Sequence, residues 1–551
     1  MVDGKVIAAV QEERFTRIKH QTGMPFNSIK FCLNKANISL KDVSYLAYDK
    51  NVFEGLKKRG LYWIKEILIG NNNAYSLFKT ECLGIIPQIA KLIELKSKMN
   101  EKSKLFFVSH HLSHISSSYF SNNIKSSALL SIDFMGELAS TWCGVAKKDK
   151  IEEIFKIDFP HSLGILYTAI TEYLGFEKLC DEYKIMGLAS YGKPTFSNEM
   201  NDIVILKLNG KFELNLEYFN FHRTLGKTLY VSDKFINIFG MPRKTEEKVN
   251  QRHADIAASL QYIMEKTVLH ILKFLRKNTK KKVLCYGGGV SLNCKINSKI
   301  AEANLFDKIL IHPAADDSGN ALGVCYYVNQ VLLKNSKIKQ LNNIYLGPEF
   351  QDIEIEKILK DMRFDYIYLV NNEKTIQKCV KDLYRGKVVG WFQGGMEWGP
   401  RALGNRSILA DPSNRYIVDL INDKIKNREK FRPFAPSVLK EHMNKYFYIN
   451  SDSEFMLFLF DAKNITKEKA PAIVHVDGTS RVQSVDKKKN YLYWNLINEF
   501  YRLKGVPILL NTSLNVRGEP IVNSPNDALK LFSSTNLDVL YLNNFRIVKS
   551  H

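Results

Sequence analysis

The chain has 551 residues, which is too long for one hydrophobic core and predicts two large domains or three smaller units. Its 45% hydrophobic and 25% charged residues are typical of a globular protein. Lys+Arg 79 against Asp+Glu 57 gives a formal net charge of +22, but the excess is spread along the chain and no nucleic-acid-binding motif accompanies it. We therefore interpret the charge as an attraction for anionic substrates and do not expect a nucleic-acid partner.

No apolar run approaches the about 18 residues of a membrane span, and the first residues do not have the pattern of a secretory signal. The eight cysteines are scattered without CxxC spacing, which is typical of reduced, buried thiols. These features predict a cytoplasmic location. The oligomeric state is not readable from the sequence.

Short β-type runs alternate with amphipathic helices along the first part of the chain. Each run ends in a turn that is rich in polar residues or glycine, and a helical pattern follows. This repetition predicts α/β architecture, in which ligands bind at the carboxyl ends of the strands. The predicted strands cover residues 104–108, 128–132, 283–286 and 308–311, and a long helix covers residues 254–274.

A new α/β segment begins near residues 345–350. We therefore place a domain boundary close to residue 350, with one domain over residues 1–350 and a second over residues 351–551. In the second domain, the apolar run 506–510 predicts a strand that leads into a polar segment.

Two histidines follow the first predicted strand with helical spacing. His110 and His114 are four residues apart and so share one helix face, as two ligands of one metal must. Two ordinary histidines would give the same spacing. However, two other predicted strands lead to Asp133 and Asp317, and two imidazoles with two carboxylates suit Fe(II), Mn or Zn. His111 would point away from this face.

Segments rich in glycine predict a nucleotide site. The run 287–289 follows a strand and precedes a helix, where backbone N–H groups and the helix N-terminus can hold phosphate. A tight turn is the alternative for this run, and a solvated side chain is the alternative for Lys184. The candidate nucleotide ligands are Lys184, Gly187, Gly287, Gly288, Gly289 and Asn293, together with Arg406 from the second domain.

Arginines lie beside glycine and proline over residues 399–407, and a second basic run ends near Pro436. Arginine forks match planar oxyanions, and glycine lets a ligand approach the main chain, so the pattern indicates a site for a phosphoryl or acyl-phosphate group. Solvated surface arginines are the alternative. A Ser-x-Asn pair on an extended segment adds two side chains that project to one side. The candidates are Arg401, Lys426, Arg432, Ser513 and Asn515.

Together these motifs resemble the O-carbamoyltransferase family of the nodulation and antibiotic-biosynthesis type. The resemblance covers nearly the whole chain. Its most specific motifs are DDSGNALG at 316–323, GPRALGNRSILADP at 399–412, FRPFAPS at 431–437 and NTSLNVRGEPIV at 511–522.

The resemblance implies an actin/sugar-kinase-like fold for the N-terminal domain. For the C-terminal domain it implies the small α/β fold that makes threonylcarbamoyl-adenylate in tRNA modification. It further implies that the C-terminal domain forms a carbamoyl-adenylate from carbamoyl phosphate and ATP with Mg²⁺, using the five anion-site candidates. The N-terminal domain would then transfer the carbamoyl group to a hydroxyl of a sugar or natural product. The two histidines and two aspartates match the family's metal ligands, and iron is the metal implied.

One departure from the family pattern lies at the N-terminus. Family members usually begin with an extra strand and a His-Asp-Ser type turn before the segment that matches Gly4–Arg17. We therefore expect an N-terminal domain without its first strand and with an exposed sheet edge.

Two other functions stay open from the sequence. One is a threonylcarbamoyl-type tRNA-modifying enzyme, and the other is a non-catalytic relative that binds nucleotide or metal. The acceptor is not readable from the sequence, and His111 is a candidate general base.

Overall fold

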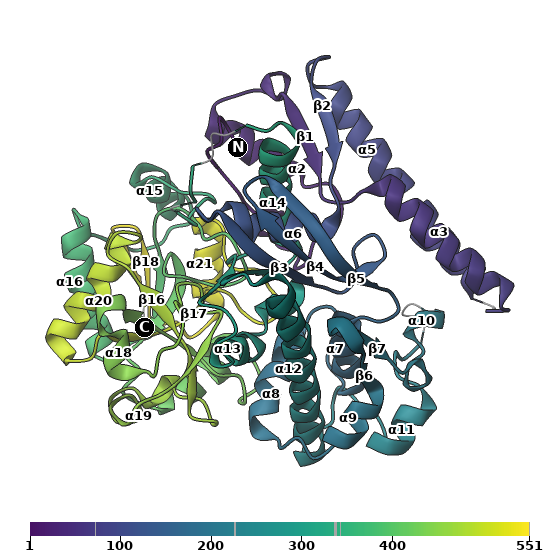
Figure 1. Cartoon of the computed structure of the whole chain (residues 1–551). Helices are drawn as coiled ribbons and strands as arrows, with labels where there is room; N and C mark the ends of the chain where they lie inside the picture. Colours follow the sequence, from purple (N-terminus) through teal and green to yellow (C-terminus); the bar gives the residue numbers. More distant parts are fainter. Residues whose placement is uncertain (72, 225–227, 336–338, 342, 550–551) are drawn as a thin grey trace. The chain divides into compact units, whose positions relative to one another are not determined.

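In this computed structural model the chain is described over residues 1–551 except 72, 225–227, 336–338, 342 and 550–551 (Figure 1). It divides into two compact units. Unit 1 contains Met1–Val6 and Leu33–Leu341, and unit 2 contains Ile7–Cys32 and Asn342–His551. Residues 7–32 therefore pack with the C-terminal part of the chain. The functional boundary at residue 350 stays a prediction.

A five-stranded sheet with the order β5-β4-β3-β8-β9 forms the centre of unit 1. Strands β3, β4 and β5 are antiparallel neighbours, whereas β3, β8 and β9 run parallel. Almost all of β3 is buried, as expected for a strand covered on both faces. In Figure 1, α6 and α14 lie above this sheet and α12 lies below it. The bounds are β3 Ser126–Ile132, β4 Ala139–Lys147, β5 Lys150–Asp158, β8 Val283–Gly287, β9 Lys308–Ile311, α6 His110–Phe120, α12 Gln251–Thr279 and α14 Asn320–Tyr327.

The strand predicted before the two histidines lies outside this central sheet. It forms β2, which pairs in parallel with β1 in a separate two-stranded sheet. Helix α6 follows β2 directly and contacts β3 and β8. The remaining longer elements from this part of the chain are α2 Phe26–Ala36, β1 Tyr45–Tyr48, α3 Val52–Leu68, α5 Ile86–Ser97, β2 Lys104–Phe107, α7 Leu163–Tyr173, α8 Glu182–Leu188, α9 Ser197–Ile203, α11 Asp233–Phe239 and α13 Cys294–Glu302.

Unit 2 is built on an eight-stranded mixed sheet with the order β10-β19-β18-β11-β12-β17-β13-β16. Helices α16 and α20 pack together and cover a core that contains Trp391, Leu409, Leu509 and Tyr541. The bounds are β10 Ile367–Tyr368, β11 Val389–Phe392, β12 Arg406–Ala410, β13 Ala435–Leu439, β16 Gln483–Val485, β17 Ile508–Ser513, β18 Val539–Leu542, β19 Phe545–Val548, α1 Glu13–Thr16, α15 Asp352–Asp361, α16 Asn372–Tyr384, α20 Tyr491–Lys504 and α21 Pro525–Ser534.

These elements confirm the mixed α/β class and all five predicted strands. The predicted helix 254–274 lies inside α12, and the predicted strand 506–510 appears as β17, which continues through Ser513. Among the described residues, the structure contains no helix with the length and apolar character of a membrane span.

Candidate functional site

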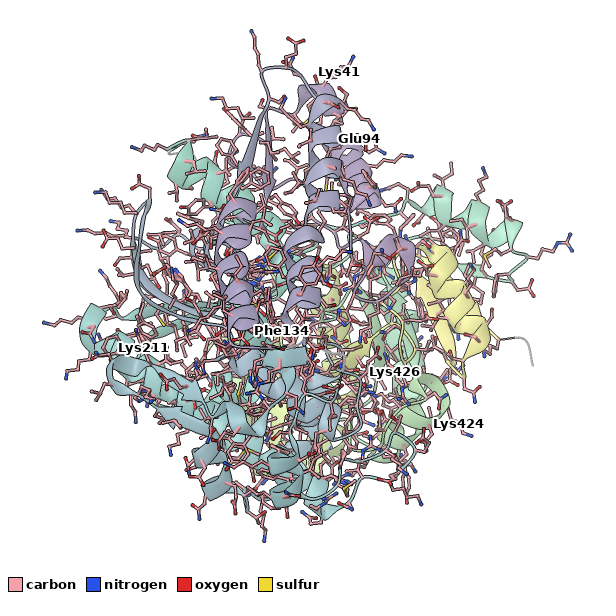
Figure 2. All side chains as sticks on the ribbon, turned by 90° about the vertical axis from the view of Figure 1, so that its right-hand side faces the viewer. Lys41, Glu94, Phe134, Lys211, Lys424 and Lys426 are labelled. Carbon is pink, nitrogen blue, oxygen red and sulfur yellow. The ribbon has the colours of Figure 1, made fainter. Side chains whose placement is uncertain are left out.

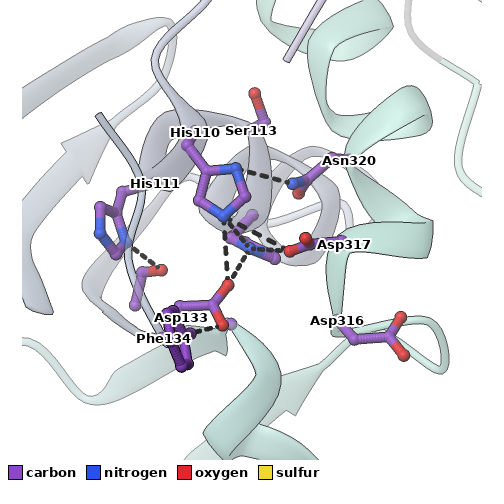
Figure 3. Close-up of polar contacts among 12 residues, drawn as sticks. His110, His111, Ser113, Asp133, Phe134, Asp316, Asp317 and Asn320 are labelled. Atoms are coloured by element: carbon purple, nitrogen blue, oxygen red, sulfur yellow. Dashed lines mark hydrogen bonds and ion pairs between the residues drawn. The ribbon is translucent and has the colours of Figure 1, made fainter. Parts of the chain in front are cut away.

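Four predicted metal ligands meet at one point of unit 1 (Figure 3). His110 and His114 come from α6, Asp133 follows β3, and Asp317 follows β9. The two histidine Nε2 atoms are 3.1 Å apart. Asp133 Oδ2 lies 3.2 Å from Nε2 of His110 and 2.6 Å from that of His114. Asp317 Oδ1 lies 3.4 Å and 3.3 Å from the same two atoms.

The spacing of these donor atoms fits a single metal ion. Ligand atoms about 2.1 Å from one ion stand about 3.0–3.4 Å apart when they subtend about 90–109°. The five separations that involve a histidine nitrogen run from 2.6 to 3.4 Å, and all four donor atoms lie within 4.8 Å of one another. Two imidazole nitrogens with two carboxylate oxygens are a donor set for Fe(II), Mn or Zn.

The cluster is buried on the histidine side and open at Asp317, whose side chain is 71% exposed. Burial would lower the pKa of both histidines, but Asp317 and Asp133 hold the pKa of His110 well above its ordinary value. Burial is likewise outweighed at His114, where Asp133 raises the pKa to about 9. Without a metal the four groups therefore stabilise one another as charged pairs. A metal ion that binds here would replace the histidine protons.

Glu137 fixes the start of α6, a role that no sequence pattern indicated. Its Oε1 accepts the backbone N–H of His110 at 3.0 Å and that of Asn51 at 2.8 Å. A carboxylate at a helix N-terminus also interacts favourably with the helix dipole. On the other side of the His110 ring, Asn320 Nδ2 lies 3.4 Å from Nδ1. These contacts orient the first turn of α6, which carries the histidines.

His111 points away from the cluster, as predicted, and forms two hydrogen bonds. Its Nε2 donates to Ala139 O at 2.9 Å, because a carbonyl can only accept. Its Nδ1 then accepts from Ser131 Oγ at 2.8 Å. Burial lowers the pKa of His111 to about 3. The role of His111 as a general base stays a prediction.

The glycine run 287–289 passes directly beside the metal ligands. A Cβ atom at Gly287 would lie 3.0 Å from His114 O, and one at Gly289 would lie 3.1 Å from Asp133 Oδ1. Gly288 has φ +87°, a conformation that a larger residue would rarely adopt. The absence of side chains here lets the run pack closely against the backbone of His114 and Ile132 and beside Asp133.

The other nucleotide candidates of unit 1 lie on neighbouring helices. Asn293 Oδ1 accepts from Lys295 N and Ile296 N, both at 3.1 Å, and so caps α13. Lys184 and Gly187 lie in α8, where buried Lys184 Nζ is 2.8 Å from Asp181 Oδ2. Contact between Met186 and Cys294 brings α8 against the start of α13. The candidates are therefore grouped, and their contact with nucleotide stays a prediction.

In unit 2, Lys426, Ser513 and Asn515 form one cluster. The buried Lys426 Nζ donates to Asn515 Oδ1 at 2.7 Å, to Asn515 O at 2.9 Å, to Ser513 Oγ at 3.2 Å and to Ser513 O. Ser513 Oγ also donates to Asn515 Oδ1 at 2.6 Å, so both side chains lie on one side, as predicted. Figure 2 shows Lys426 among other side chains, whereas Lys424 extends outward.

Positive charge gathers around this lysine. Burial, followed by the charges of Arg428 and Arg432, holds the pKa of Lys426 well below its ordinary value. Glu429 lies 3.7 Å from Arg432 and 3.4 Å from Arg517. A bound anion would stabilise the charged form of this buried lysine.

Arg401 and Arg406 occupy different positions in their motif. Arg401 lies in the loop between β11 and β12, and its role at the anion site stays a prediction. Arg406 is fully buried, and its guanidinium lies 3.6 Å from the centroid of the Phe392 ring. The Arg406 guanidinium donates to the carbonyls of Pro348, Gln393, Gly394 and Asn405 at 2.7–3.0 Å. These contacts make Arg406 a structural residue of the loop, and contact with nucleotide stays a prediction.

Glu397 anchors the same loop and was not a sequence candidate. Its Oε1 accepts the backbone N–H groups of Leu403 at 2.9 Å, Asn405 at 2.7 Å and Arg406 at 3.1 Å. Glu397 is buried, and Gly404 in the anchored turn has φ +110°. The loop that carries Arg401 is therefore held in one shape by its own polar groups.

Comparison with known proteins identifies relatives over the full chain. Residues 1–326 match the family model described as carbamoyltransferase N-terminus, and residues 380–549 match that described as carbamoyltransferase C-terminus. An uncharacterized protein of Synechocystis sp. is 40% identical, over 100% of this chain and 94% of its own length. Nodulation protein NolNO of Sinorhizobium fredii is 36% identical, over 99% of this chain and 78% of its own length.

Solved structures give only a distant likeness. HypF from T. kodakarensis is 15% identical with a TM-score of 0.25, over 45% of this chain and 39% of its own. Component A of (R)-2-hydroxyglutaryl-CoA dehydratase from Acidaminococcus fermentans is 13% identical with a TM-score of 0.32, over 61% of this chain and 93% of its own. These scores are too low to place an active site by superposition. The two family models and the relatives that match nearly end to end show that the chain belongs to the carbamoyltransferase family.

Proposed function

We propose that this carbamoyltransferase activates carbamoyl phosphate with ATP and transfers the carbamoyl group to a hydroxyl of a sugar or natural product. The observation that carries the activation step is the Lys426 cluster. There a buried lysine contacts the Ser513 hydroxyl and the Asn515 amide, and the charges of two arginines lower its pKa. Such a site suits a small dianion such as the phosphate of carbamoyl phosphate.

Activation is needed because a carbamoyl carbonyl is a poor electrophile. Water cleaves carbamoyl phosphate into phosphate and carbamate. A carbamate oxygen then attacks the α-phosphorus of ATP and expels pyrophosphate, which gives carbamoyl-adenylate. Lys426 and Arg432 offset the phosphate charge during these steps, Arg401 orients the second anion, and Ser513 and Asn515 bind the neutral end.

Transfer belongs to the cluster of unit 1, and iron is the metal we propose for it. When bound, the metal supplies a Lewis acid that polarises an oxygen of the intermediate. His110, His114, Asp133 and Asp317 hold the ion, and Glu137 keeps α6 in place. We assign the adenylate to the run 287–289 together with Lys184, Gly187 and Asn293. The acceptor hydroxyl oxygen attacks the carbamoyl carbon, the bond from that carbon to the phosphate oxygen breaks, AMP leaves, and the hydroxyl proton passes to solvent.

A pyrophosphate exchange assay on the full-length, iron-loaded chain tests the activation step. Labelled pyrophosphate should enter ATP only when carbamoyl phosphate is present. Lys426→Met should reduce this exchange by about 100-fold, because it removes a buried cation from the developing charge. Arg401→Ala should also reduce it. Lys424→Met is the matched control, since Lys424 is exposed on the same turn, and should leave the exchange unchanged.

Three results would contradict the proposal. They are no exchange by the wild-type chain, an unchanged rate in Lys426→Met, and exchange that requires threonine and bicarbonate in place of carbamoyl phosphate. The third result would favour the tRNA-modifying alternative.

A further inference from the structure

Two loops of unit 2 carry the residues that the proposed function assigns to carbamoyl phosphate. The first, residues 393–405, contains Arg401, and the second, residues 514–522, contains Asn515. The loops meet in a small buried apolar cluster of Met396, Ala402 and Ile521. Because Ala402 is the neighbour of Arg401, a shift of either loop would move the anion-binding groups.

The second loop is closed on itself and tied to the Lys426 cluster. Val522 N donates to Leu514 O at 2.9 Å, and Asn515 Nδ2 donates to Glu519 O at 2.7 Å. Asn515 Oδ1 at the same time accepts from Lys426. The backbone at residues 519–522 therefore sets where the Asn515 side chain lies.

Two arginines from the N-terminal segment contact both loops. Arg14 lies in α1, is buried, and donates from Nη2 to Gly399 O at 3.0 Å in the first loop. Arg17 follows α1 and donates from Nη1 to Ile521 O and from Nη2 to Pro520 O, both at 2.7 Å, in the second loop. Each contact joins residues that are 385 or more positions apart in the sequence.

The local structure holds these side chains in place. Arg17 has φ 62°, a left-handed conformation that ends α1. Its guanidinium also lies 3.7 Å from Asp527. Arg14 donates to Gln11 Oε1 at 2.5 Å, and Gly399 has φ +121°, which few other residues would adopt. Carbonyls that face two fixed guanidinium groups have little freedom to move.

We propose that Arg14 and Arg17 are positioning residues of the C-terminal anion site, although they lie at the other end of the chain. They hold the loops 393–405 and 514–522 in register, so that Arg401, Lys426 and Asn515 converge on one ligand. This inference rests on the proposed function for the identity of the ligand, carbamoyl phosphate. The contacts between the two arginines and the two loops do not depend on the proposed function.

Steady-state exchange kinetics of the full-length chain test the proposal. Arg14→Ala and Arg17→Ala should each raise KM for carbamoyl phosphate by about tenfold, because displaced binding groups lose alignment. Lys30→Ala, an exposed change in the same segment, should have wild-type KM. Arg546→Lys is the control for general destabilisation, because it weakens the buried Asp382–Arg546 pair of the same unit. It should lower the melting temperature and leave KM unchanged.

Hydrogen–deuterium exchange gives a readout that does not depend on activity. Arg14→Ala should speed amide exchange mainly in residues 393–405, and Arg17→Ala mainly in residues 514–522, with no change in Lys30→Ala. Wild-type KM together with unchanged amide exchange in both arginine variants would overturn the proposal. Absence of pyrophosphate exchange in the wild-type chain would overturn the proposed function, and amide exchange would still decide whether the arginines hold the loops.

Discussion

Glu397→Gln removes the charge from the anchor of the Arg401 loop while it keeps an acceptor oxygen in nearly the same place. In the wild-type chain one oxygen accepts three backbone N–H groups at 2.7–3.1 Å. Hydrogen bonds to a charged group contribute about 1.5–3 kcal/mol and neutral ones about 0.5–1.5 kcal/mol, so the three bonds lose about 3 kcal/mol. The amide is cheaper to bury than the carboxylate, which reduces the expected loss to about 2 kcal/mol.

Thermal unfolding followed by tryptophan fluorescence measures this loss, because Trp391, Trp398 and Trp494 all lie in unit 2. For a unit of this size the melting temperature should fall by about 4–8 °C. The melting temperature of Glu397→Ala should fall further, because this change leaves three buried N–H groups without that acceptor. Glu373→Gln, an exposed change at the start of α16, is the matched control and should shift stability by less than about 0.5 kcal/mol. A Glu397→Gln variant as stable as the wild type would refute the reasoning.

The remaining predictions concern the metal cluster and acid stability. Asp133→Asn should weaken iron, manganese or zinc binding by more than about tenfold in equilibrium dialysis with elemental analysis. Asp316→Asn, next to the proposed ligand Asp317, should not, because the Asp316 carboxylate accepts from Ser318. Burial would raise the pKa of Asp382, but its hydrogen bonds from Arg546 and Tyr541 hold that pKa below its ordinary value. A depressed carboxyl pKa stabilises the fold above the unfolded value of about 3.9, and this contribution is lost as pH falls below that value. Acid titration of unfolding free energy should therefore be flatter below about pH 4 in Asp382→Asn than in the wild type.

The meeting of the two histidines and two aspartates could be predicted because their positions follow local rules. His110 and His114 have helical spacing, and Asp133 and Asp317 come after strands that proved to belong to one sheet. The strand before the histidines was also predicted correctly, but the sequence did not indicate which sheet it would join. β2 pairs with β1, and only tertiary packing decides which strands become neighbours.

Residues whose side chains bind buried backbone groups could not be identified from sequence patterns. Arg406 was predicted to be a ligand because it shares a motif with Arg401, and only the fold shows that carbonyls surround its guanidinium. Glu397 and Glu137 accept backbone N–H groups, which every residue type supplies, so the sequence contains no sign of these partners. The same limit applied to Arg14, whose partner Gly399 is 385 positions away.

Because residues 7–32 belong to unit 2, recombination between related genes can separate residues that pack together. The chain passes between its two packing units near residues 6, 32 and 341, so the order of the gene does not follow the order of the units. A single crossover that replaced only the C-terminal half with that of a relative would separate Arg14 and Arg17 from the loops they evolved with. Substitutions in residues 14–17 should therefore covary with substitutions in the loops 393–405 and 514–522 among relatives. Chimeric proteins should retain activity best when all three segments come from one parent.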